Sequence, residues 1–113
     1  MARVAAFIPD LLFGSNVLGA LRTGGHEAVL IDDPATIEAD TVDVLVVDLT
    51  VDPQERIARV IAAERLAATP KLAFYSHVEA DVRTLARDAG FELVVPRSRM
   101  AREGPTLVTS LAA

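Results

Sequence analysis

The chain has 113 residues, of which 51% are apolar and 24% charged, and its formal net charge is −5. This length and composition suit one globular domain over residues 1–113 and exclude a disordered chain. The acidic balance argues against nucleic acid or an anionic membrane surface as a partner, and the absence of cysteine excludes a disulfide framework.

Nothing in the sequence indicates export or membrane insertion. No apolar run approaches the roughly 20 residues that a membrane-spanning helix needs. The first residues, MARVAAFIPD, lack the pattern of a signal peptide. We therefore expect a cytoplasmic protein.

Short apolar runs alternate with segments of helical periodicity along the chain. Several of the runs are apolar at successive positions, which is typical of strands covered on both faces in a parallel sheet. They predict five strands, at residues 3–8, 27–31, 43–48, 71–75 and 91–95.

The intervals between the strands predict helices with recognisable ends. Gly24 and Gly25 end the first, Asp52 and Pro53 form the N-cap and first turn of the second, and Pro105 starts the last. The segment 32–41 has room for only about two turns. The predicted helices span residues 11–23, 53–68, 77–89 and 105–112.

Apolar spacing indicates the buried side of two of these helices. Ile57, Val60 and Ile61 should face inward in the second, and Leu85 should do so in the third.

This alternation predicts an α/β fold, a three-layer sandwich with a five-stranded parallel sheet in which the helix after the second strand, at 32–41, is short. Parallel strands require right-handed crossovers that place helices on both faces of the sheet. The strand order expected for five strands in so small a chain is 2-1-3-4-5. Ligands of such sheets bind beyond the carboxyl ends of the strands.

Two carboxylates follow strands at that edge. Asp10 comes after the first strand, and Asp48 ends the run DVLVVD. Such a pair could hold a divalent cation through its oxygens. Alternatively, Asp48 caps the next turn by accepting hydrogen bonds from backbone N–H groups near Thr50 or Val51.

With these residues in place, the chain resembles the receiver domains of two-component response regulators, which have the flavodoxin-like or CheY-like fold. The resemblance implies that Asp48 is the phosphoacceptor and that Asp10 and Asp48 bind Mg²⁺. It implies that Ser76, in LAFYSH after the fourth strand, contacts the phosphoryl group. Arg97, in LVVPRSRM after the fifth strand, would stand in for the lysine of the family.

The chain departs from the receiver pattern at two positions of this site. Pro9 occupies the place of the first of two adjacent acids, which should weaken a Mg²⁺ site. Pro96-Arg97 replaces the Lys-Pro of the family, and arginine lacks the compact ammonium group of lysine. These departures favour an atypical receiver or pseudo-receiver.

Other polar or glycine residues have structural interpretations. Ser76 and Glu79 fit a capping box at the start of the third helix. His26, after two glycines, is expected to be a turn residue. Arg97, Arg99 and Arg102 form either a solvated loop or a contact surface for an acidic partner. The glycines of FGSNVLG match no nucleotide-binding fingerprint.

The function expected from the resemblance is that of a stand-alone signalling domain. It would act through protein contacts, with a partner protein, a histidine kinase or a second copy in a homodimer. Its only enzymatic activity would be phosphorylation and dephosphorylation of Asp48. The alternatives are an interaction module that needs no phosphorylation, or a flavodoxin-like protein that binds a small ligand.

Overall fold

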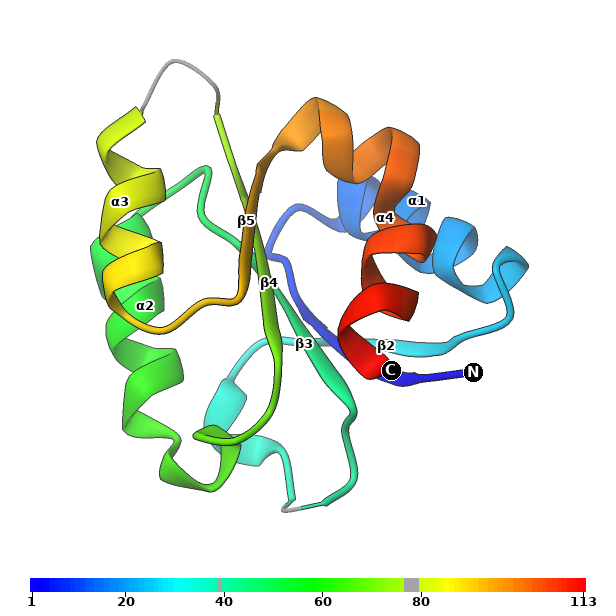
Figure 1. The fold of residues 1–113 in the computed structure, drawn as a ribbon, viewed down its shortest axis with the longest axis horizontal. Helices are drawn as coiled ribbons and strands as arrows, with labels where there is room; N and C mark the ends of the chain where they lie inside the picture. The colour runs from blue at the N-terminus through cyan, green and yellow to red at the C-terminus, as the bar shows by residue number, and fades with distance from the viewer. Residues whose placement is uncertain (39, 77–79) are drawn as a thin grey trace.

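The computed structural model describes residues 1–38, 40–76 and 80–113 and forms a three-layer α/β sandwich (Figure 1). The central sheet is parallel throughout, and its strand order β2-β1-β3-β4-β5 confirms the prediction. Its strands are β1 (Arg3–Phe7), β2 (Glu27–Ile31), β3 (Val44–Asp48), β4 (Lys71–Tyr75) and β5 (Leu93–Pro96).

Helices cover both faces of this sheet. The helices α1 (Leu11–Thr23) and α4 (Arg97–Ala112) lie on one face, and α2 (Pro53–Ala62) and α3 (Ala80–Asp88) lie on the other (Figure 1). Two short 3₁₀ turns, η1 (Pro34–Thr36) and η2 (Glu64–Leu66), complete the described elements. No helix within the described ranges is long and apolar enough to span a bilayer.

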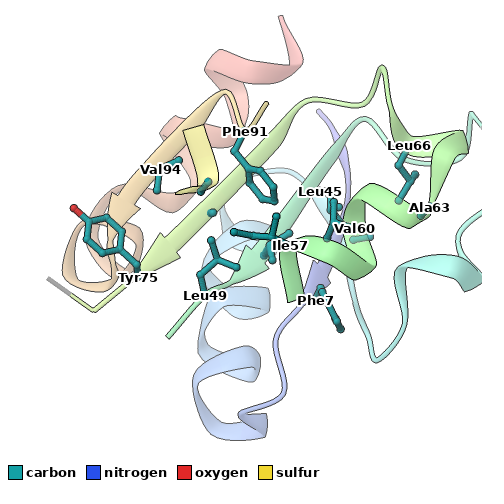
Figure 2. Packing of buried hydrophobic residues seen from close by; sticks show 14 of the residues in the cluster. Phe7, Leu45, Leu49, Ile57, Val60, Ala63, Leu66, Tyr75, Phe91 and Val94 are labelled. Carbon is teal, nitrogen blue, oxygen red and sulfur yellow. The ribbon is translucent and has the colours of Figure 1, made fainter. Parts of the chain in front are cut away.

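Alternation along the strands divides the core into two layers. Leu45 and Val47 of β3 pack toward α2 and α3, and Val44 and Val46 pack toward α1 and α4. All four are fully buried, as expected for the middle strand of a covered sheet. Figure 2 shows the first layer, with Tyr75 at one end and its hydroxyl oxygen pointing away from the other side chains.

The last helix is twice as long as predicted. It begins at Arg97, directly after β5, and Pro105 lies in its interior instead of at its start. Met100, Gly104, Leu107 and Val108 are buried at helical spacing, so one apolar face extends across the proline. Packing of this face on the sheet outweighs the lost hydrogen bond at Pro105.

The second helix is shorter than predicted. It ends at Ala62 instead of Ala68, and η2 follows. A continuous helix would place Glu64, seven residues after Ile57, on the buried side; the break buries Leu66 instead. Ile61 is 57% exposed, which contradicts the predicted inward position. Asp52 is at the N-cap as predicted, but its side chain makes no capping hydrogen bond.

Two further expectations need correction, and one lies outside the described residues. Leu85 is 37% exposed because it lies on the outer side of α3. His26 was predicted to be a turn residue, but it follows the turn at Gly24 and Gly25 and is buried. The Ala2 N–H donates to its Nδ1 at 3.0 Å, and its Nε2 lies 3.1 Å from Thr109 Oγ1 in α4, so the ring links three segments of the chain. The predicted capping box involves Glu79, one of the residues that the structure does not describe.

Candidate functional site

Asp48 ends β3 as a buried residue with 3% of its surface exposed. Its Oδ1 accepts hydrogen bonds from the Thr50 N–H at 2.8 Å and from the Thr50 hydroxyl at 2.6 Å. The structure thus confirms that Asp48 caps the following turn. Its Oδ2 makes no hydrogen bond with any part of the chain that the structure describes.

Asp10 lies at the same edge of the sheet, since β1 and β3 pair in register with Phe7 opposite Val47. Its carboxylate is the N-cap of α1, and Oδ1 accepts from the backbone N–H groups of Leu12 and Phe13 at 3.0 and 3.1 Å. Both oxygens therefore have protein partners, because Oδ2 lies 3.6 Å from Nη2 of Arg97.

Arg97 reaches this edge from the first residue of α4. Besides the ion pair with Asp10, its guanidinium lies 4.0 Å from the centre of the Phe13 ring, a cation–π contact. The longer α4 puts this arginine in a helical first turn and not in a loop. Arg99 and Arg102 are also helical and both lie beside Glu103, so the cluster is partly neutralised.

Ser76 and Arg97 share an open depression next to the end of β3. Its volume is about 590 Å³, and its walls are Thr50, Val51, Ser76, Arg97 and Ser98. The structure therefore brings together the predicted hydroxyl and the predicted basic residue beside the loop that Asp48 holds.

Arg56, a residue that the sequence reasoning missed, lies between the ends of β1 and β3. It donates from Nε to the Asp48 carbonyl oxygen at 2.7 Å and from Nη2 to the Phe7 carbonyl oxygen at 2.9 Å. Burial lowers the pKa of Arg56, while the charge of Asp48 opposes that shift. The signal in the sequence was its position four residues before Val60, on the inward stripe of α2.

The residues present fit a magnesium ion poorly. Mg²⁺ prefers octahedral oxygen coordination and needs carboxylates that are free to bind it. Here both oxygens of Asp10 and one of Asp48 already have protein partners, and Pro9 replaces an acid. Among the residues whose placement is described, no group of three acidic or histidine side chains could hold a metal ion.

Comparisons with known proteins give a clear result at the level of structure only. No family model matches the chain, and no curated protein sequence matches it either. Among solved structures, a response regulator receiver domain from Clostridium thermocellum superposes with a TM-score of 0.82 at 12% identity, covering 99% of this chain and 94% of that one. The chain has the receiver-domain fold.

Other receivers superpose over almost the whole chain as well. A response regulator receiver protein from Burkholderia phymatum gives a TM-score of 0.79 at 19% identity, with 99% of this chain and 95% of that chain covered. The receiver domain of a sensor histidine kinase from Pseudomonas aeruginosa gives 0.77 at 14% identity over 98% and 97%, and its structure carries a magnesium ion coordinated in the active-site cleft. In this chain, the receiver fold places Asp48 at the carboxyl end of β3 and Arg97 directly after β5.

Proposed function

We propose that this chain is a receiver-like signalling domain that acts through protein–protein contacts and does not require phosphorylation of Asp48. The observation that carries this proposal is the state of Asp10, whose oxygens cap α1 and contact Arg97. A receiver that binds Mg²⁺ needs this carboxylate for the ion.

The surroundings of Asp48 support the same proposal. Its Oδ1 holds the Thr50 backbone and hydroxyl, which makes the carboxylate part of the loop structure. The buried guanidinium of Arg56 donates from Nε to the Asp48 carbonyl oxygen at 2.7 Å, so a protein cation already lies at the end of β3.

NMR spectroscopy with Mg²⁺ and beryllofluoride, a mimic of a phosphoryl group, tests this proposal. We expect the amide resonances of residues 48–51 to stay unchanged in the wild-type protein. The matched variant is Pro9→Asp, which restores the second acid and should produce Mg²⁺-dependent shifts at the same amides. A saturable beryllofluoride adduct at Asp48 in the wild type would contradict the proposal.

The second candidate is phosphorylation of Asp48 with Mg²⁺, by a histidine kinase or a small phosphodonor. The depression lined by Thr50, Ser76, Arg97 and Ser98 favours it, because it offers three hydroxyls and a cation beside the loop that follows Asp48. Phosphoprotein mass spectrometry after incubation with acetyl phosphate and Mg²⁺ tests it. A mass increase of one phosphoryl group that Asp48→Asn abolishes would favour this candidate, and no increase would favour the first.

The partner that we propose is another protein, either a second copy of the chain or a kinase. Analytical ultracentrifugation of the wild type and of Asp48→Asn tests whether self-association depends on phosphorylation of Asp48. It thereby distinguishes the two candidate functions. A dimer of equal affinity in both proteins agrees with contacts that do not depend on phosphorylation. A dimer that forms only after treatment with phosphodonor would require the second candidate.

A further inference from the structure

A second depression opens at the carboxyl ends of β1 and β2, on the other side of Arg56 from the Asp48 loop. Its volume is about 640 Å³, within the range of small-molecule sites. It lies where the connection from β2 to β3 has, among its described residues, the η1 turn and no α-helix, whereas the other connections have helices. Its walls are Phe7, Ile8, Pro9, Leu11, Leu30, Ile31, Asp32, Thr36, Arg56 and Arg59.

Arg56 is the unusual member of this lining, because it is a charged residue with only 9% of its surface exposed. Buried charges in proteins are normally paired. Nε and Nη2 donate to the carbonyl oxygens of Asp48 and Phe7. Over the described ranges, no carboxylate lies within salt-bridge distance of its guanidinium, and no hydrogen bond uses Nη1.

Nη1 of Arg56 has no hydrogen-bond partner among the described residues, and Arg56 lines the depression. Every fully buried side-chain nitrogen or oxygen in the described part of the chain has a hydrogen-bond partner. Since Nη1 has none there, it is not fully buried. Arg56 lines the depression together with Phe7, and its guanidinium lies 3.8 Å from the centre of the Phe7 ring. A guanidinium that offers an N–H group in such a place is suited to bind an oxyanion.

The other charges around the depression limit the charge of its ligand. Arg59 also lines it, but its Nη2 lies 3.3 Å from Asp33 Oδ1, so this cation is already paired. The carboxylate of Asp32 belongs to the lining as well. These groups favour a ligand with a single negative charge over a phosphate dianion.

The remaining walls are apolar. Leu11 is 73% exposed at the start of α1, and Pro9 and Leu30 lie beside it in the lining. An aromatic or aliphatic group placed there would cover apolar surface that water now contacts.

We propose that this depression is a binding site for a small organic carboxylate. The carboxylate group is held by Nη1 of Arg56, and the apolar part of the molecule packs against Leu11, Pro9 and Leu30. The site agrees with the rule that open α/β sheets bind ligands beyond the carboxyl ends of their strands. Its lining includes neither Asp48 nor Ser76, so binding of a carboxylate there can be measured whether or not Asp48 is phosphorylated.

The alternative is that Arg56 only ties the ends of β1 and β3 together. A titration monitored by ¹H–¹⁵N NMR distinguishes the two, with benzoate as the probe and benzamide as its neutral match. A site that binds carboxylates shows saturable benzoate shifts at residues 7–11, 30–32 and 56–59, with a dissociation constant of about a millimolar, as expected for so small a ligand. Benzamide and inorganic phosphate should bind at least about tenfold more weakly.

Two neighbouring leucines provide a control for the position of the site. Leu11 and Leu12 are exposed to 73% and 76%, but only Leu11 lines the depression. Leu11→Asp places a negative charge inside the site and should weaken benzoate binding about tenfold or more. Leu12→Asp should leave it unchanged.

Three outcomes would overturn the proposal. These are shifts that do not saturate, equal affinities for benzoate and benzamide, and equal effects of Leu11→Asp and Leu12→Asp. Arg56→Lys adds a check on the guanidinium, since lysine keeps the charge but loses the fork of donors. A folded Arg56→Lys variant that binds benzoate as the wild type does would exclude the contact through Nη1.

Discussion

At the end of β3, a short hydrogen bond from the Thr50 hydroxyl holds the carboxylate of Asp48 in the structure of the following loop. The Thr50 hydroxyl donates to Oδ1 at 2.6 Å, in a place where Asp48 is almost fully buried. Thr50→Val replaces the hydroxyl by a methyl group of similar size. Because the lost bond is to a charged group, we expect the free energy of unfolding in urea to fall by about 1.5–3 kcal/mol.

Thr41→Val is the control for this substitution. Thr41 also donates a side-chain hydrogen bond, at 2.7 Å to the Glu38 carbonyl oxygen, but on an exposed loop. We expect its loss to change the unfolding free energy by less than about 0.5 kcal/mol. Equal effects of the two substitutions would mean that Asp48 does not hold its loop through Thr50.

Asp43 gives a prediction about acid stability. Its Oδ1 accepts from the Arg3 side chain at Nη2, 3.1 Å away, and its Oδ2 accepts from the Arg3 backbone N–H at 2.8 Å; the side-chain bond and then the backbone bond lower the pKa of the carboxyl. A lowered pKa stabilises the fold above the unfolded value of about 3.9 and loses that effect as the pH falls through the folded value.

The variant Asp43→Asn should therefore be less stable than the wild type at pH 7. The difference in stability should shrink as the pH falls below about 4, where Asp43 becomes protonated in the unfolded state. It should become small once Asp43 is protonated in the folded state as well. Since the pair is exposed, 0.5 M NaCl should reduce the difference at pH 7. Urea denaturation at a series of pH values measures both effects, and a difference that grows on acidification would contradict the assignment.

Single residues show where sequence reasoning is sufficient. The cap formed by Asp48 was predicted as one of two alternatives, because it depends on neighbours only two residues away. The positions of Arg56 and His26 were missed. Their partners are up to 49 and 83 residues distant along the chain, at Phe7 and Thr109, and a local pattern contains no information about such partners.

At the scale of elements, the end of α1 and the middle of α4 are in close contact. A Cβ atom added at Gly24 would lie 2.7 Å from Cβ of Pro105, closer than real atoms approach. The backbone of Gly24 has an ordinary φ of −76°, which alanine adopts without strain. The contact with Pro105 is therefore the main obstacle to an alanine at this position. Gly24→Ala should destabilise the protein by about 1–3 kcal/mol.

Gly19, in the same helix, is the matched control. No atom lies within 4 Å of a Cβ added at this position. Gly19→Ala should stabilise the protein by about 0.5–1 kcal/mol, because alanine loses less backbone entropy in a helix. Thermal unfolding of both variants checks the signs. Stabilisation by both would show that α4 is not packed against the end of α1.

The errors in predicted elements have one physical cause. Strands and their order follow from local apolar runs and chain handedness, and these predictions were confirmed. Helix limits depend on which side chains the sheet can bury. Pro105 is a start signal in isolation, but the buried face from Met100 to Val108 extends the helix through it. Tertiary packing therefore decided what local propensity left open.

At the scale of the whole molecule, the sheet is covered unevenly. β2 and β5 are both edge strands, with one hydrogen-bonded neighbour each. Both faces of β5 contribute to a core layer, through Val94 and Val95. On β2, Ala28 is buried in one layer, Leu30 and Ile31 are only partly buried against the two layers, and Val29 is 56% exposed beside the short η1 turn. The fold alone does not predict this difference, because it follows from the length of one connection.

Native-state hydrogen exchange should reveal this asymmetry. The amides of β2 that pair with β1 should exchange through local opening, at a lower free energy than the paired amides of β5. Those of β3, buried between β1 and β4, should exchange only through global unfolding. Since both edge strands have a single paired neighbour, the comparison isolates the cover provided by helices. Equal protection of β2 and β5 would mean that the depression beside η1 costs the sheet no stability.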